Sequence, residues 1–179
     1  MLPNVLTPHT KDELYSFLKS LVSDPALAPK DGVTYCNFAL QRVGKFYNYP
    51  YFDGLLADQI SQKAISGEFP SIIKTTGEDA VGFAMKGGLC FAAKFFDPHG
   101  HVSVVAPVPA AFSPSWNKNI PVLANVGETN GFIPTSQAFP VSQGEPDYFL
   151  LLGSAVVPPF SWVSFFLDLV KVIRKRNSG

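Results

Sequence analysis

A cysteine at the entrance of a predicted helix is the side chain of this sequence best suited to nucleophilic chemistry. Cys36 follows the turn-forming pair Asp31 and Gly32, and it opens a helical run that Gly44 is expected to end. Backbone N–H groups and the helix dipole favour an anion at such a position, so they favour the thiolate, the nucleophilic form of cysteine. We therefore predict that Cys36 is a nucleophile. The alternative is that it is an ordinary small, buried apolar residue.

A cysteine nucleophile needs a base within hydrogen-bonding distance, and that base is usually a histidine. The chain contains three histidines. His101 is the best candidate because it opens a predicted strand directly after a tight turn, where its ring can project from the sheet edge toward a helix end. His9 lies in a proline-containing leader and His99 lies inside the turn. We predict that His101 is the general base.

A third polar group should accept the second N–H of the imidazole and so orient the ring. Asn125 is the lone polar side chain of the apolar run 120–127. An amide buried without a partner costs about 1–3 kcal/mol, so Asn125 is expected to have one. Glu128 and Asn130 follow closely in the sequence and are rivals for the same role.

The histidines also raise the question of a metal site. Asp97, His99 and His101 stand at alternate positions, as metal ligands on a strand would. No second cluster of ligand residues accompanies them to complete a coordination sphere. We predict no metal and no cofactor.

Tyrosines flank the predicted nucleophile helix at both ends. Tyr47 and Tyr49 follow it and could line a groove that holds the substrate, although packing of a long loop would explain them equally. Tyr35 precedes Cys36, where its backbone could supply an oxyanion donor. These three tyrosines are the candidate substrate-binding residues.

The segments that must position these residues fall into a helical half followed by a strand-rich half. Helices are predicted over residues 11–22, 36–44, 55–66 and 77–86, the first with a Thr10–Glu13 capping box. Strands are predicted over residues 89–96, 101–108, 120–127 and 147–153, the first two forming a hairpin. This order predicts an α+β fold with helices packed on a central antiparallel sheet.

Composition is typical of one folded domain over residues 1–179. Hydrophobic residues make up 46% of the chain and charged residues 16%, which excludes a disordered protein. Lysine plus arginine and aspartate plus glutamate number 14 each, so no global field attracts nucleic acid. The two cysteines, Cys36 and Cys90, are too few for a disulfide framework.

The two ends of the sequence bear on location. The first residues lack the basic start and apolar core of a classical signal peptide, so we expect synthesis in the cytoplasm. Residues 158–176 form an apolar segment that is short for a membrane span, and they are predicted to be a helix. That helix could dock on the domain, lie on a membrane surface or bind a partner.

Three stretches occur in an informative order: "GVTYCNFALQRVG", then "GHVSVVAP", then "PVLANVG". Together they resemble the NlpC-type and CHAP cell-wall hydrolases, from about residue 31 to residue 127. The resemblance implies a papain-like fold and a cysteine peptidase or amidase that cleaves peptide or amide bonds of peptidoglycan without a cofactor. It implies that Cys36 is the nucleophile, that His101 is the base, and that Asn125 is the third residue, or Glu128 if the CHAP enzymes are the closer relatives.

The resemblance also implies partners and a place of action. The substrate would be a peptidoglycan stem peptide at the cell wall or in the periplasm, reached by non-classical secretion or after lysis. A phage lysin or a secreted effector would fit, and an effector would have a cognate immunity protein. Two rival functions use the same residues differently: a cysteine acyltransferase acting on a lipid or acyl donor, and a binding module in which Cys36 is merely packed.

Overall fold

The computed structural model describes residues 5–96, 99–139 and 141–155. The described helices are α1 (Lys11–Val22), η1 (Pro25–Leu27), α2 (Cys36–Phe46), η2 (Pro50–Phe52), α3 (Ala57–Ser66), α4 (Gly77–Ala84), α5 (Thr135–Ala138) and η3 (Val141–Gln143). The strands are β1 (Ile72–Thr75), β2 (Cys90–Phe96), β3 (His99–Val105), β4 (Ala111–Ser113), β5 (Lys118–Ile120), β6 (Val122–Asn125), β7 (Gly131–Pro134) and β8 (Asp147–Leu151). The predicted helix over residues 158–176 and the turn at residues 97–98 lie outside the described residues.

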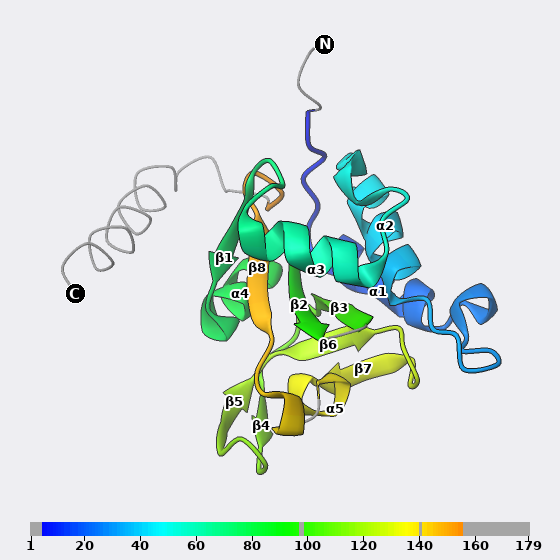
Figure 1. Ribbon diagram of the computed structural model, residues 1–179. Helices are drawn as coiled ribbons and strands as arrows, with labels where there is room; N and C mark the ends of the chain where they lie inside the picture. Colours follow the sequence, from blue (N-terminus) through cyan, green and yellow to red (C-terminus); the bar gives the residue numbers. More distant parts are fainter. Residues whose placement is uncertain (1–4, 97–98, 140, 156–179) are drawn as a thin grey trace.

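A six-stranded sheet with the order β1-β8-β2-β3-β6-β7 forms the centre of the molecule (Figure 1). Every neighbouring pair in it is antiparallel. The predicted β2–β3 hairpin is present, with Ala93 opposite Val102. Strands β4 and β5 form a separate ribbon. The predicted α+β class, with helices on an antiparallel sheet, is confirmed.

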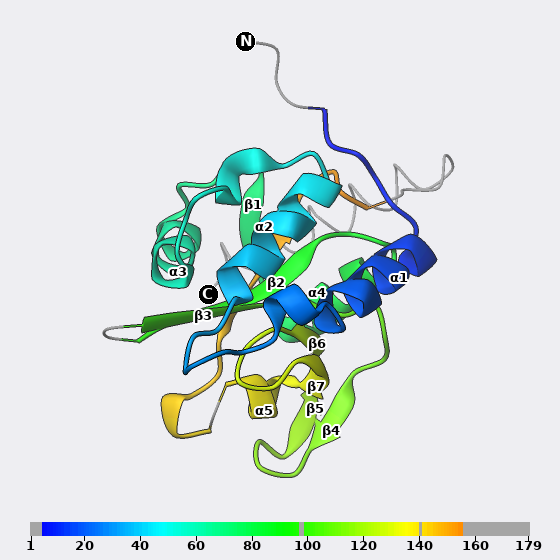
Figure 2. The ribbon, with the colours of Figure 1, turned by 90° about the vertical axis from the view of Figure 1, so that its right-hand side faces the viewer.

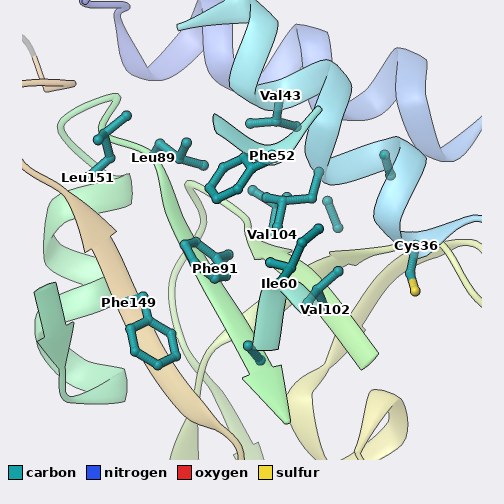
Figure 3. Packing of buried hydrophobic residues seen from close by; sticks show 14 of the residues in the cluster. Cys36, Val43, Phe52, Ile60, Leu89, Phe91, Val102, Val104, Phe149 and Leu151 are labelled. Atoms are coloured by element: carbon teal, nitrogen blue, oxygen red, sulfur yellow. The ribbon is translucent and has the colours of Figure 1, made fainter. Parts of the chain in front are cut away.

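Strand alternation gives the sheet two apolar faces. Helices α1, α2 and α3 cover one face, and α4 and α5 pack on the other (Figures 1 and 2). On β3, Val102 and Val104 face the first set of helices, whereas Val105 faces the second. Figure 3 shows the larger core, in which Phe52 and Phe91 pack edge to face with centroids 5.5 Å apart. This core fixes α2, and therefore Cys36, against β3.

Local sequence signals explain most of the helix ends. The capping box of α1 is formed: Glu13 N donates to Thr10 Oγ1, and Thr10 N donates to the Glu13 carboxylate. Helix α3 ends at Gly67, whose φ of 73° lies in the left-handed region that favours glycine. Helix α4 ends at Ala84, two residues before its predicted end. Within the described residues, no helix is long and apolar enough to cross a membrane.

The predicted end of α2 at Gly44 is wrong. The helix continues to Phe46, and Gly44 lies buried within it. A Cβ at Gly44 would lie 2.6 Å from the carbonyl oxygen of Tyr49, whose backbone N–H donates to Gly44 O. Glycine is required here because the following loop folds back onto the helix and leaves no room for a side chain. Gly44 does not mark the end of the helix.

Candidate active site

Cys36 is the first residue of α2 and is held there by a tight turn. Lys30 and Val33 exchange two backbone hydrogen bonds across Asp31 and Gly32, which both have positive φ (52° and 78°). The predicted turn at this pair is therefore present, and it leads the chain directly into α2. Cys36 lies at the edge of the larger core, away from Phe52 and Phe91 (Figure 3), and is 5% exposed.

The thiol of Cys36 is subject to two opposing effects. Burial raises its pKa above the ordinary value of 9.0, while the nearby backbone N–H groups of Val102, Asn37 and Cys36 act to lower it. Burial is the larger effect. The prediction that the helix entrance favours the thiolate is thus wrong, because the net effect is to raise the pKa of the thiol. Cys36 rests as a thiol and needs a base.

His101 lies half-buried at the start of β3 and is oriented by Asn125. His101 Nε2 lies 2.8 Å from Asn125 Oδ1, and Asn125 Nδ2 donates to Thr129 O at 2.7 Å. Because an amide oxygen only accepts, Nε2 carries the proton and Nδ1 keeps a free lone pair. Asn125 is 3% exposed, so this buried amide has the partners that its sequence context predicted.

The pKa of His101 is shifted below the ordinary value of 6.5. Burial is the largest cause, and the hydrogen bond to Asn125 and the negative charge of Glu128 act in the opposite direction. At neutral pH the imidazole is therefore uncharged and can accept a proton. A neutral imidazole and a protonated thiol are the two forms that general-base activation requires.

One pocket, of about 700 Å³, joins these groups. The four candidate catalytic residues, Cys36, His101, Asn125 and Glu128, all line it. The backbone N–H of Val102, the residue after His101, lowers the pKa of the Cys36 thiol, so this part of β3 lies near the sulfur. The other residues that line the pocket are Gly32, Thr34, Asn37, Leu56, Ala57, Asp58, Phe96, His99, Gly100, Gly127, Thr129, Ile133, Gln137, Ala138 and Gln143.

The geometry distinguishes the rivals for the third position. Asn125 bonds the imidazole directly, whereas Glu128 is exposed at the pocket and acts on His101 through its charge. Asn130 contacts neither imidazole nitrogen; its side chain bonds Gly127 N and Leu27 O. Asn125 therefore occupies the place of an orienting residue.

Two of the predicted substrate-binding tyrosines belong to the core. Tyr47 is fully buried and donates its hydroxyl to Gly87 O at 2.6 Å. Tyr49 is 3% exposed and donates to Pro70 O at 2.7 Å. Neither lines the pocket. The groove interpretation is wrong for both, because the loop after α2 turns inward onto Gly44.

Tyr35 is half-buried at the N-cap of α2, and its side chain packs against the larger core. It is not a lining residue of the pocket. Its side chain makes no capping hydrogen bond, and the first N–H groups of a helix have no partner within the helix. The backbone N–H of Cys36 is thus suited to meet an oxyanion.

The other two histidines have different surroundings. His9 stacks on Phe46 at the far end of α2, with ring centroids 3.6 Å apart. His99 is exposed at the pocket rim. Among the described residues no group of three His, Cys, Asp or Glu side chains could hold a metal ion. Asp97, part of the metal pattern considered above, lies outside the described residues.

Two glycines contribute to the pocket in a way that sequence reasoning missed. A Cβ at Gly100 would lie 2.6 Å from Asp58 Cα, so only glycine lets the start of α3 approach β3 beside His101. A Cβ at Gly127 would lie 3.3 Å from His101 Cε1. The one available signal was a glycine inside a strand or just after it, which often marks close backbone approach.

No family model matches the chain, and no curated protein matches it. The function is therefore inferred from the pocket and its residues.

Proposed function

We propose that this protein is a cysteine hydrolase that cleaves peptide or amide bonds, with Cys36 as nucleophile, His101 as general base and Asn125 as orienting residue. The observation that carries the proposal is one pocket lined by all three side chains, in which Asn125 holds the imidazole as its Nε2–H tautomer. That tautomer leaves Nδ1 free to take a proton. A buried, strand-borne cysteine such as Cys90 has no such arrangement.

The mechanism follows from the protonation states. His101 Nδ1 accepts the thiol proton as Cys36 Sγ bonds to the substrate carbonyl carbon, and the resulting oxyanion accepts a hydrogen bond from the Cys36 backbone N–H. The imidazolium then gives its proton to the amide nitrogen, the C–N bond breaks, and the amine leaves. Water, deprotonated by His101, attacks the thioester; this releases the carboxylic acid and restores the thiol.

We further propose a papain-like arrangement and a peptidoglycan stem peptide as the substrate. The nucleophile begins a helix, and the orienting residue lies on β6, which is next to β3 in the sheet. The base is the third residue of β3, which begins at His99 and not at His101 as predicted. This arrangement agrees with the resemblance of the three sequence stretches to NlpC-type and CHAP hydrolases. The protein would then act at the cell wall or in the periplasm, as a lysin or as an effector with an immunity protein.

Digestion of purified peptidoglycan tests this proposal. Wild-type protein is expected to release new amino groups, and mass spectrometry of the fragments identifies the bond. The variant Cys36→Ala should release none, and His101→Ala should be about 100- to 10,000-fold slower. Cys90→Ala is the matched control, because it removes the other thiol from the opposite face of the sheet.

Two outcomes would overturn the hydrolase proposal. Turnover retained in Cys36→Ala would remove the nucleophile. A thioester on Cys36 that passes its acyl group to an alcohol or amine, with no new amino groups released, would indicate an acyltransferase.

A further inference from the structure

We propose that Asn130 is a positioning residue that holds the His101 side of the pocket in register with the Cys36 side. This inference rests on the proposed function, because it concerns how the two reacting groups are held together. A chain of hydrogen bonds leads from the turn after β6 to η1, without involving the thiol or the free imidazole nitrogen.

The first part of this chain lies in the turn between β6 and β7. Asn130 Oδ1 accepts a hydrogen bond from Gly127 N at 3.0 Å, which closes the turn. The same turn presents Thr129 O to Asn125 Nδ2 at 2.7 Å, and it places Gly127 beside His101 Cε1. The orientation of the imidazole therefore depends on the shape of this turn.

The second part leads to the nucleophile. Asn130 Nδ2 donates to Leu27 O at 2.9 Å. Leu27 is 2% exposed and ends η1, whose N-cap is the side chain of Asp24. Asp24 also forms an ion pair with Arg42 of α2, the helix that begins with Cys36.

The two hydrogen bonds of Asn130 thus join η1 to the turn whose Thr129 O accepts from the amide of Asn125. The Asp24–Arg42 ion pair links η1 in turn to α2. Core packing already presses α2 onto β3, but it is non-directional. A planar amide that donates on one side and accepts on the other fixes distance and angle. A misplacement of about 1 Å in a catalytic group can cost about 100-fold in rate, so such a link has a kinetic consequence.

The variants Asn130→Ala and Asn130→Asp test this inference. Asn130→Ala removes both bonds. Asn130→Asp keeps an acceptor for Gly127 N–H but cannot donate to Leu27 O, so it leaves the turn closed and cuts only the link. In both variants we expect kcat to fall about 10- to 100-fold, with KM changed less than about threefold.

A second measurement needs no substrate. In the wild type, the hydrogen-bonded Nε2–H of His101 should give a protected imidazole signal in ¹H–¹⁵N NMR spectra. Asn130→Ala opens the turn and should weaken or lose this signal, whereas Asn130→Asp leaves the turn closed and should keep it. Asn48→Ala is the matched control: it removes a similar bond, from Nδ2 to Val5 O, at a residue with φ of 56°. That variant should lower the melting temperature yet keep both kcat and the signal.

The inference is overturned if folded Asn130→Asp has wild-type kcat, or if folded Asn130→Ala has a wild-type imidazole signal, since Asn130 would then be only structural. If Asn130→Ala fails to fold, the Asp variant still decides. If the proposed function is wrong, turnover survives in Cys36→Ala. The NMR comparison of the wild type with Asn130→Ala needs no substrate, so it can be made whether or not the proposed function holds.

Discussion

The two cysteines of this chain lie on opposite sides of the same sheet, and of the two only Cys36 lines the pocket that also holds His101. Cys90 is fully buried at the start of β2, against α4, and its thiol pKa is raised well above 9.0 by burial. Cys36 is also buried and its pKa is also raised, but it lines a pocket and shares that pocket with an imidazole. Burial is common to both thiols, whereas access and a base belong to Cys36 alone.

The comparison teaches that pKa direction by itself does not identify a nucleophile. Both thiols are protonated at neutral pH, so the difference must come from what can remove the proton. His101 is held neutral by burial and oriented by Asn125, and it lines the pocket of Cys36. It is the base that we propose for Cys36. The predictions below test the contrast between the two regions.

The largest expected difference is in thiol labelling. With iodoacetamide under native conditions, Cys36 in the Cys90→Ala variant should label at least about 1,000-fold faster than Cys90 in the Cys36→Ala variant, because Cys90 reacts only after unfolding. Labelling of Cys36 should rise with pH toward and beyond 9.0, since burial raises its pKa and the reactive thiolate increases as pH rises. Equal labelling of both thiols would remove the contrast.

The next largest effect distinguishes Asn125 from Glu128. Asn125→Ala leaves the His101 Nε2–H without its buried acceptor, which costs about 1–3 kcal/mol and corresponds to about 5- to 150-fold in kcat. Glu128→Gln loses only a charge at an exposed side chain, so kcat should change less than about threefold. Steady-state kinetics on an isolated fragment measure both. The reverse order would make Glu128 the orienting residue.

A smaller effect is expected when a methyl group is added beside the imidazole. In Gly127→Ala the new Cβ would lie 3.3 Å from His101 Cε1 and 3.2 Å from Asn125 Nδ2, so both side chains must shift by a few tenths of an ångström. We expect kcat to fall about two- to tenfold with little change in melting temperature. The control Gly82→Ala adds the same methyl to α4, where nothing lies within 4 Å.

The smallest effect is a shift in pH dependence. Turnover needs neutral His101 and protonated Cys36, so kcat/KM should fall as the pH drops below the His101 pKa, itself below 6.5, and fall again as the pH rises past the Cys36 pKa, above 9.0. The negative charge of Glu128 raises the His101 pKa. Glu128→Gln should therefore move the acidic limb to lower pH. An acidic limb unmoved or shifted upward would contradict this assignment.

Much of the helical half could be predicted because its signals are local. The capping box at Thr10 and the glycine after α3 act over a single turn of chain. Gly44 misled because its role is a contact with Tyr49 O, which no local pattern reveals. Strands β1, β4, β5 and β7 were missed; each has only three or four residues, too few for alternation to show.

The candidate site was predicted in part for the same reason. Cys36 and His101 could be nominated from their positions at element starts, and Asn125 from its polarity on an apolar strand. Tyr47 and Tyr49 could not be placed correctly, because whether an aromatic loop faces a groove or the core depends on how the loop folds back. The Asn130–Leu27 bond spans 103 positions and left no trace in the sequence pattern.

The place of β8 in the sheet determines the point during synthesis at which the central sheet can be completed. This strand, the last in the described chain, inserts between β1 and β2, with Ile72 opposite Leu151 (Figure 1). Nucleophile and base leave the ribosome long before residues 147–151 do, but two strand edges stay unpaired until then. Such non-local pairing slows folding and prolongs exposure of apolar surface. A nascent chain thus carries Cys36 and His101 in an incomplete sheet until residues 147–151 have been made.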